Sequence, residues 1–185
     1  ANYSFYFVLA WLPFYLVKAR GLPVAEMAVI GGSLYLVMAL SCLLFGHLYQ
    51  AWMAAGASAT RAGKTIAITG HVASAVGLAL CAIGGLSLTV VSLFFTAFVM
   101  SMIGPLLYAT GQTLAGPANG GKWVTLQNFL GNLAGIIAPA LTGFVIGGRF
   151  GFAPAFIIAA GAALIGVIGW AVLIRKIAPL EWGQA

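Results

Sequence analysis

The chain has 185 residues, of which 63% are hydrophobic and only 5% are charged, against about 25% charged residues in an ordinary soluble domain. This composition excludes a water-soluble fold, because so few charged side chains would leave large apolar patches facing water. The net charge of +6 comes from Lys and Arg residues that stand singly or in pairs between apolar runs, which is typical of membrane topology determinants and not of a nucleic-acid-binding patch.

Six apolar runs follow one another along the chain, and most are long enough to cross a bilayer core of roughly 30 Å. Their predicted ranges are 3–17, 27–49, 66–83, 88–108, 123–146 and 153–174. The first run is short, and the chain enters it at Ala1 without the basic segment and cleavage site of a signal peptide. We therefore expect an all-α, polytopic membrane protein of six transmembrane helices that is a piece of a longer chain.

The basic residues of the connections indicate an orientation. One set of connections and the C-terminal tail hold Arg61, Lys64, Lys122, Arg175 and Lys176, and the other set holds Lys18, Arg20 and Arg149. Five cations against three predict that the first set is cytoplasmic, so both ends of this segment are expected in the cytoplasm. The acidic residues are only Glu26 and Glu181, and neither lies within a predicted span.

Prolines interrupt corresponding runs of a three-plus-three arrangement. Pro13 lies in the first run and Pro105 in the fourth. Broken helices at corresponding places are typical of nested inverted repeats in a transporter half, and we expect bending during gating at these two prolines. Several glycines of the last two runs are expected to let helices approach closely, namely Gly131, Gly135, Gly143, Gly161 and Gly166.

Three stretches resemble the anion:cation symporter family of the major facilitator superfamily. AGPANGGKWVTLQNFLGNLAGIIAPALTGF is similar to the family's corresponding loop and helix, YFVLAWLPFYLVKARGLPVAEMA to its seventh helix and following outer loop, and GASATRAGKT to the cytoplasmic loop after its eighth helix. The resemblance covers essentially the whole chain and implies helices seven to twelve of a twelve-helix transporter, without the N-terminal six-helix domain. It implies uptake of small organic anions, such as sugar acids or other carboxylates, coupled to protons or sodium, in a bacterial inner membrane.

The gate motif of that family is altered in this chain. The family usually has a Gly at the end of the eighth helix, an Asp four residues on, and then a basic pair. Here Gly46 is followed four residues later by Gln50, and Ala54 and Ala55 stand in place of the basic pair. The resemblance implies a gating role for Gly46 and Gln50, but Gln50 can only hydrogen-bond and has no charge.

Amides in the fifth run are the main candidates for substrate contact, because a polar side chain at membrane depth is costly unless it faces a bundle interior or a cavity. Asn128 and Asn132 are spaced i, i+4 and share a helix face, and Gln127 lies beside them. By resemblance, Asn128 occupies a position that lines the sugar-acid site. The alternative for Asn132 and Gln127 is hydrogen bonding between helices.

Other candidates lie in the fourth and first runs. Ser101 is expected to reach the cavity, whereas Tyr108 and Gln112 on the same face lie nearer the cytoplasmic mouth. Tyr6 and Trp11 of the first run are expected either to stack on a sugar or to anchor the helix at the membrane interface.

The remaining polar and sulfur-containing residues are expected to be structural. His47 and His71 titrate near neutral pH in general, but we assign both to packing, and Cys42 and Cys81 have no metal-ligand spacing and are expected to be buried. No cofactor or metal is expected. Because no acid lies within a span, the proton-carrying carboxylate and the cation that pairs with the substrate are expected in the absent half.

Intramembrane proteases and channels are two other classes of protein with several apolar helices. A rhomboid-type protease would need a GxSG turn, and GGSL at residues 31–34 lacks the final Gly, so we expect no enzyme. A water channel would need NPA turns and a cation pore rings of acids or a filter motif, neither of which is present. The alternative that stays open is a self-contained six-helix protein that works as a dimeric half-size transporter or channel.

Overall fold

Helices form all the regular structure in residues 1–180, the part of the chain that the computed structural model describes; Glu181 lies outside it. The α-helices are α1 (Asn2–Phe14), α2 (Val24–Ala54), α3 (Ala59–Ile83), α4 (Leu86–Met100), α5 (Ile103–Asn132), α6 (Ala134–Ile146) and α7 (Ala153–Ile168). Two π-helical segments, Tyr15–Ala19 and Gly169–Leu173, continue α1 and α7. The all-helical class predicted from the sequence is confirmed.

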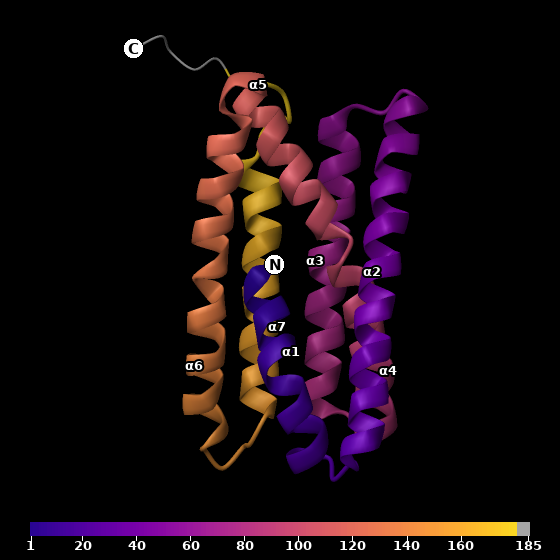
Figure 1. Ribbon diagram of the computed structural model, residues 1–185, viewed down its shortest axis with the longest axis vertical. Helices are drawn as coiled ribbons and strands as arrows, with labels where there is room; N and C mark the ends of the chain where they lie inside the picture. Colours follow the sequence, from indigo (N-terminus) through magenta and orange to yellow (C-terminus); the bar gives the residue numbers. More distant parts are fainter. Residues whose placement is uncertain (181–185) are drawn as a thin grey trace.

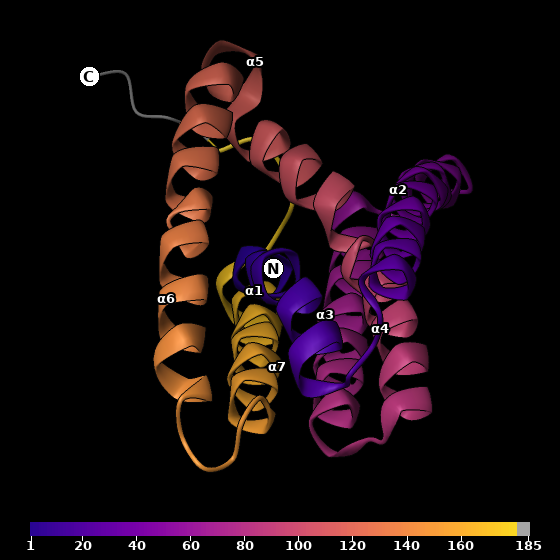
Figure 2. The ribbon, with the colours of Figure 1, turned by 60° about the horizontal axis from the view of Figure 1, so that its bottom comes forward.

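The helices run roughly along one long axis, so that the connections gather at two ends (Figure 1). The α1–α2, α3–α4 and α6–α7 connections lie at the lower end of Figure 1, and the α2–α3 connection, the bend of α5 and the C-terminal segment lie at the upper end. The N-terminus lies at mid-height. Seen from two directions, α1 and α7 stand between α6 on one side and α2 on the other (Figures 1 and 2).

The helix α5 consists of two arms that meet at Gly116. This residue has φ +71° and ψ 173°, a conformation that glycine adopts without the steric cost a side chain would add. Pro117 then begins the second arm, where its missing N–H costs nothing and its fixed φ suits a helix start. The chain therefore rises along the first arm, turns at the upper end, and descends through the second arm into α6 (Figure 1).

Four helical stretches are long and apolar enough to cross a membrane: Val24–Ala54, Ala59–Ile83, Leu86–Ile146 and Ala153–Leu173. The third has 61 residues and contains the bend at Gly116. The helix α1 has 13 residues and is not among them. A polytopic membrane protein is therefore confirmed, whereas the six-span count stays a prediction.

The helices extend beyond several predicted ranges. The segment 51–65, expected to be a polar loop, is helical except around residues 55–58, because α2 continues to Ala54 and α3 begins at Ala59. Ser58 caps α3 by accepting a hydrogen bond from the backbone N–H of Arg61 at 3.2 Å, which satisfies one of the free donors of the first turn. The segment 113–122, between the fourth and fifth predicted runs, likewise breaks the helix only at Gly116.

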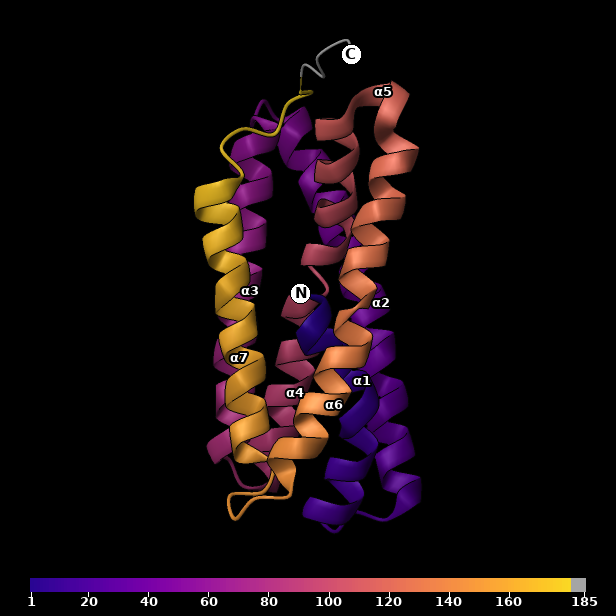
Figure 3. The same ribbon diagram turned by 90° about the vertical axis from the view of Figure 1, so that its left-hand side faces the viewer.

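The core is built around α3, which packs along α7 on one side (Figure 3) and along α4 on another. Small residues permit this packing, as is usual where lipid removes the hydrophobic drive between helices. A Cβ on Gly77 of α3 would lie 3.1 Å from the ring of Phe95 and would overlap the hydroxyl of Thr96. The α3–α4 approach therefore requires a glycine at position 77.

Candidate functional site

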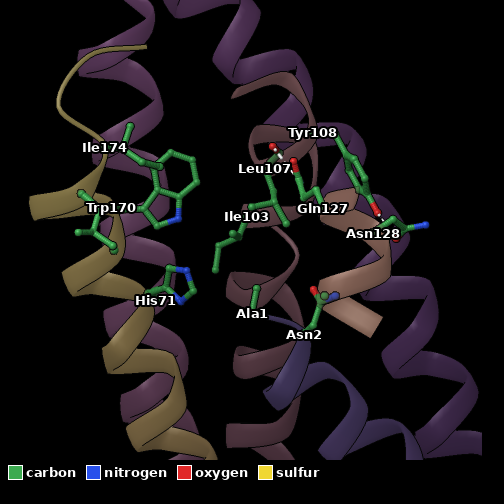
Figure 4. Close-up of a pocket in the computed structure, with 14 residues that line it drawn as sticks. Ala1, Asn2, His71, Ile103, Leu107, Tyr108, Gln127, Asn128, Trp170 and Ile174 are labelled. Carbon is green, nitrogen blue, oxygen red and sulfur yellow. Dashed lines mark hydrogen bonds between the residues drawn. The ribbon is translucent and has the colours of Figure 1, made fainter. Parts of the chain in front are cut away.

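A cavity of about 410 Å³ lies in the middle of the bundle, between α3 and α7 on one wall and α5 and the start of α1 on the other (Figure 4). Its polar lining consists of Asn2, His71, Tyr108, Gln127 and Asn128. Apolar side chains such as Ile103, Leu107, Trp170 and Ile174 make up most of the rest. This mixture of an apolar wall with a few converging polar groups is typical of small-molecule sites, whose volumes run from about 300 to 1,000 Å³.

The candidate residues of the fifth run meet two tyrosines in a hydrogen-bonded chain. The Tyr6 hydroxyl donates to Asn132 Oδ1 at 2.5 Å, Asn132 Nδ2 donates to Asn128 Oδ1 at 3.3 Å, and the Tyr108 hydroxyl donates to the same oxygen at 3.2 Å. We call Tyr6, Asn132, Asn128 and Tyr108 the amide chain. It joins α1 to both arms of α5.

The hydrogen bonds of the amide chain leave donors free. Asn128 uses its oxygen twice, and its amide nitrogen has no hydrogen-bond partner within residues 1–180. Gln127 is different, because its Nε2 donates to the backbone carbonyl of Leu107 at 3.3 Å and ties the two arms of α5 together. Free amide N–H groups can donate to the carboxylate or hydroxyl oxygens of an organic acid.

A second cavity, of about 350 Å³, adjoins the first, and Tyr108 and Asn2 line both. Ser101 lies on the second cavity at the break between α4 and α5, where its hydroxyl donates to the carbonyl of Ala97 at 2.9 Å and keeps its oxygen as an acceptor. Tyr35 and Cys42 of α2 form the opposite wall. Nothing in the sequence separates these two from their apolar neighbours. The expectation that both cysteines are buried is wrong for Cys42, which is only partly buried, and correct for Cys81.

Trp11 lies apart from the amide chain. Its Nε1 donates to the carbonyl of Pro139 at 3.2 Å, and its ring covers Gly143 at 3.3 Å from the position of a Cβ. Its edge also meets the rings of Phe14 and Phe152. Trp11 therefore packs α1 against α6 and lines neither of the two cavities.

Two of the four gating candidates meet in the structure. A Cβ on Gly46 of α2 would lie 3.8 Å from Pro105, so α2 passes α5 closely just beyond the break at residues 101–102. Gln50 lies one turn further along α2 and is exposed. Pro13 lies within α1, and the helix widens into the π-helical segment Tyr15–Ala19 directly after it.

The two cavities carry little charge. No Asp, Glu, Lys or Arg lines either of them within the described residues, and Glu26, the one carboxylate side chain of residues 1–180, is exposed at the start of α2. Across that same range, no group of three or more His, Cys, Asp or Glu side chains could hold a metal ion. An anion in these cavities would therefore meet amides, hydroxyls and the imidazole of His71.

Known proteins with similar sequences are transporters. No family profile matches the chain. It is 31% identical to a hexuronate transporter of Bacillus subtilis over 97% of its own length and 42% of the relative's. It is 28% identical to a probable galactarate/D-glucarate transporter of Escherichia coli over 95% and 39% of the two lengths, and 26% identical to an Escherichia coli D-galactonate transporter over 94% and 40%. The chain thus spans about 40% of the length of these relatives.

A solved structure has the same fold. A mutant of the peptide transporter POT in complex with alafosfalin superposes with a TM-score of 0.76 over 97% of this chain and 39% of the other, at 18% sequence identity. At this identity the likeness establishes the helical arrangement and says nothing about the ligand.

Proposed function

Because the chain belongs to the major facilitator superfamily and is similar to its sugar-acid transporters, we propose that it forms the C-terminal six-helix half of a transporter for small organic anions. In this proposal the six spans are α1 with its π-helical extension, α2, α3, α4 with the first arm of α5, the second arm of α5 with α6, and α7. The half works by alternating access, rocking against a second half around a site at mid-membrane.

The free amide nitrogen of Asn128 is the observation that supports the substrate class best. Its oxygen is held by two neighbours of the amide chain, so the direction of its N–H groups is fixed, and it borders the central cavity. A sugar acid offers several hydroxyl and carboxylate oxygens to such donors. Ser101, which lines the second cavity, is proposed to complete the contacts. Structural hydrogen bonds occupy the other candidates of the first and fifth runs, namely Tyr6, Trp11, Asn132 and Gln127, and neither Tyr6 nor Trp11 lines either cavity.

The bending points of the proposed motion are the two interrupted helices. Pro105 removes a backbone donor just after the break between α4 and α5, and Pro13 precedes the π-helical segment of α1. The contact between Gly46 and Pro105 places α2 against one of these points. We propose that α2, with the uncharged Gln50 one turn further on, moves with this break when the cavity changes its accessible side.

Within the described residues, no Asp, Glu, Lys or Arg that could balance an anion lines the two cavities, so we propose that the other half holds a pairing cation and the coupling acid, and that protons drive uptake. The upper end of the bundle holds Arg61, Lys64, Lys122, Arg175 and Lys176. We propose that this end faces the cytoplasm of a bacterial inner membrane, following the distribution of positive charges.

The test is uptake of radiolabelled D-glucuronate, galactarate and D-galactonate by proteoliposomes that contain the complete protein as its gene encodes it. An inward proton gradient is expected to increase uptake, and a protonophore to abolish the increase. Asn128→Ala removes the free donor, and losing one hydrogen bond to a hydroxyl group, about 0.5–1.5 kcal/mol, should raise the KM about 2- to 10-fold. Asn119→Ala, in the same helix but on neither cavity, is the matched control.

Two results would contradict the proposal at different points. If the wild-type protein takes up none of the three sugar acids, the substrate class is wrong. If uptake occurs but Asn128→Ala behaves like Asn119→Ala, the transporter assignment stands and the site is elsewhere.

A further inference from the structure

His71 is a buried imidazole without a hydrogen-bond partner in the described part of the chain. It lies midway along α3, is 2% exposed and lines the central cavity. Figure 4 shows it on the wall formed by α3 and α7, across the cavity from Asn2, Gln127 and Asn128. Its ring nitrogens are not among the fully buried side-chain atoms without a partner in residues 1–180, which are the hydroxyl oxygens of Thr96, Thr110 and Thr142, so they stay open to a ligand in the cavity.

The imidazole is held in place by the helix that faces it. A Cβ on Gly166 of α7 would lie 2.6 Å from both Nδ1 and Nε2 of His71, so this contact exists only because position 166 has no side chain. Ile103 and Trp170 line the cavity beside the ring. The ring is thus kept at the cavity wall by apolar neighbours and not by polar ones.

Within residues 1–180, no acid faces this imidazole. From α7, Gly166 contacts the ring, and Gly169 and Trp170 of the following π-helical segment line the same cavity. Within residues 1–180, the other titratable side chain on the cavity is the Tyr108 phenol of α5. Lys64 lies two turns away on α3, and its Nζ donates to the carbonyl of Ala171. The complementary partner that the described residues do not supply is an anion, because an imidazolium and a carboxylate form a charge-assisted hydrogen bond.

We propose that His71 binds the carboxylate of the sugar acid as an imidazolium, while the amides across the cavity bind the hydroxyl groups of the sugar acid. This inference rests on the proposed function. An imidazole binds a carboxylate most strongly when it is protonated, so the anion and one proton from the open side of the cavity are taken up together. His71 is then a substrate-binding and proton-accepting residue of this half, in addition to the cation and the coupling acid proposed for the other half, and the approach of Gly166 is what keeps it in position.

The test measures binding of D-glucuronate to the purified, complete protein by calorimetry at pH 6 and pH 8. The wild type should bind several-fold more tightly at pH 6. His71→Gln keeps a hydrogen-bonding group but cannot hold the proton, so affinity at pH 6 should fall about 10- to 100-fold and the difference between the two pH values should shrink. The matched control is His47→Gln, on α2 and exposed, which should leave both unchanged.

A second pair of variants keeps the test valid if His71→Gln fails to fold. Gly166→Ala crowds the imidazole and should weaken binding at pH 6, whereas Gly161→Ala on the same helix, where a Cβ meets nothing within 4 Å, should not. If His71→Gln and Gly166→Ala both bind with wild-type affinity and pH dependence while Asn128→Ala loses binding, the role of His71 is refuted and the proposed function stands. If the wild type binds no sugar acid, both are refuted.

Discussion

Replacing Arg20 should destabilise the lower end of the bundle, because its guanidinium joins three elements. Nε donates to the Tyr15 hydroxyl at 2.7 Å, and NH2 donates to the carbonyl of Gly84 at 2.6 Å and to Thr89 Oγ1 at 3.0 Å. Thr89 is fully buried. Arg20 therefore ties the end of α1 to the α3–α4 turn, and its hydrogen-bond partners within residues 1–180 are all uncharged.

The magnitude follows from these three bonds. Hydrogen bonds to charged groups contribute about 1.5–3 kcal/mol each, but the three share one side chain and are not additive. The Thr89 hydroxyl also keeps weaker contacts at 3.4 Å to Tyr15 and Gly84. We expect Arg20→Gln to cost about 2–4 kcal/mol, which corresponds to a decrease of about 5–10 °C in melting temperature for a chain of this size.

The assay is the apparent melting temperature of the purified protein in detergent, followed by tryptophan fluorescence. Arg149→Gln is the matched control, because Arg149 is exposed and contacts only the ring of Phe150 among the interactions found for it. Arg20→Lys should recover only part of the loss, since an ammonium cannot reproduce the planar fork of a guanidinium. Equal melting temperatures for Arg20→Gln and Arg149→Gln would refute the reasoning.

Two further predictions concern packing and exposure. Gly77→Ala forces a methyl group against Thr96 and should cost about 1–3 kcal/mol in unfolding free energy, whereas Gly161→Ala should change the melting temperature little; equal effects would contradict the close approach of α3 and α4. A maleimide should label Cys42 faster than Cys81, which is 1% exposed, and bound sugar acid should slow the labelling of Cys42. Faster labelling of Cys81 would contradict the position of Cys42 on the wall of the second cavity.

The apolar runs of the sequence predicted membrane helices because a bilayer accepts only segments whose backbone groups bond internally. Boundaries were less predictable. The polar stretch around Arg61 was expected to be a loop, yet α3 begins at Ala59, because a helix continues past the bilayer core when a cap such as Ser58 satisfies its first turn. The predicted runs 88–108 and 123–146 left a connection that contains Gly116 and Pro117, and the chain does turn there.

The site was predicted only in part. The i, i+4 spacing placed Asn128 and Asn132 on one face, and they are hydrogen-bonded to each other. Trp11 was expected to stack on a sugar or to anchor the helix at the interface, and its ring packs against α6. His71 was assigned to packing, and its imidazole also lines the central cavity. Helical periodicity tells which residues share a face, but not what that face meets.

The sequence by itself determined that this protein lies in a membrane and that its secondary structure is helical, because both depend on the composition of short segments and on local backbone preferences. Only the tertiary structure decided which polar groups share a cavity. Tyr6 and Asn132 meet across 126 positions of sequence, and His71 faces the amides because α3 and α5 lie on opposite walls. Such neighbours depend on how whole helices pack, and no local pattern carries that information.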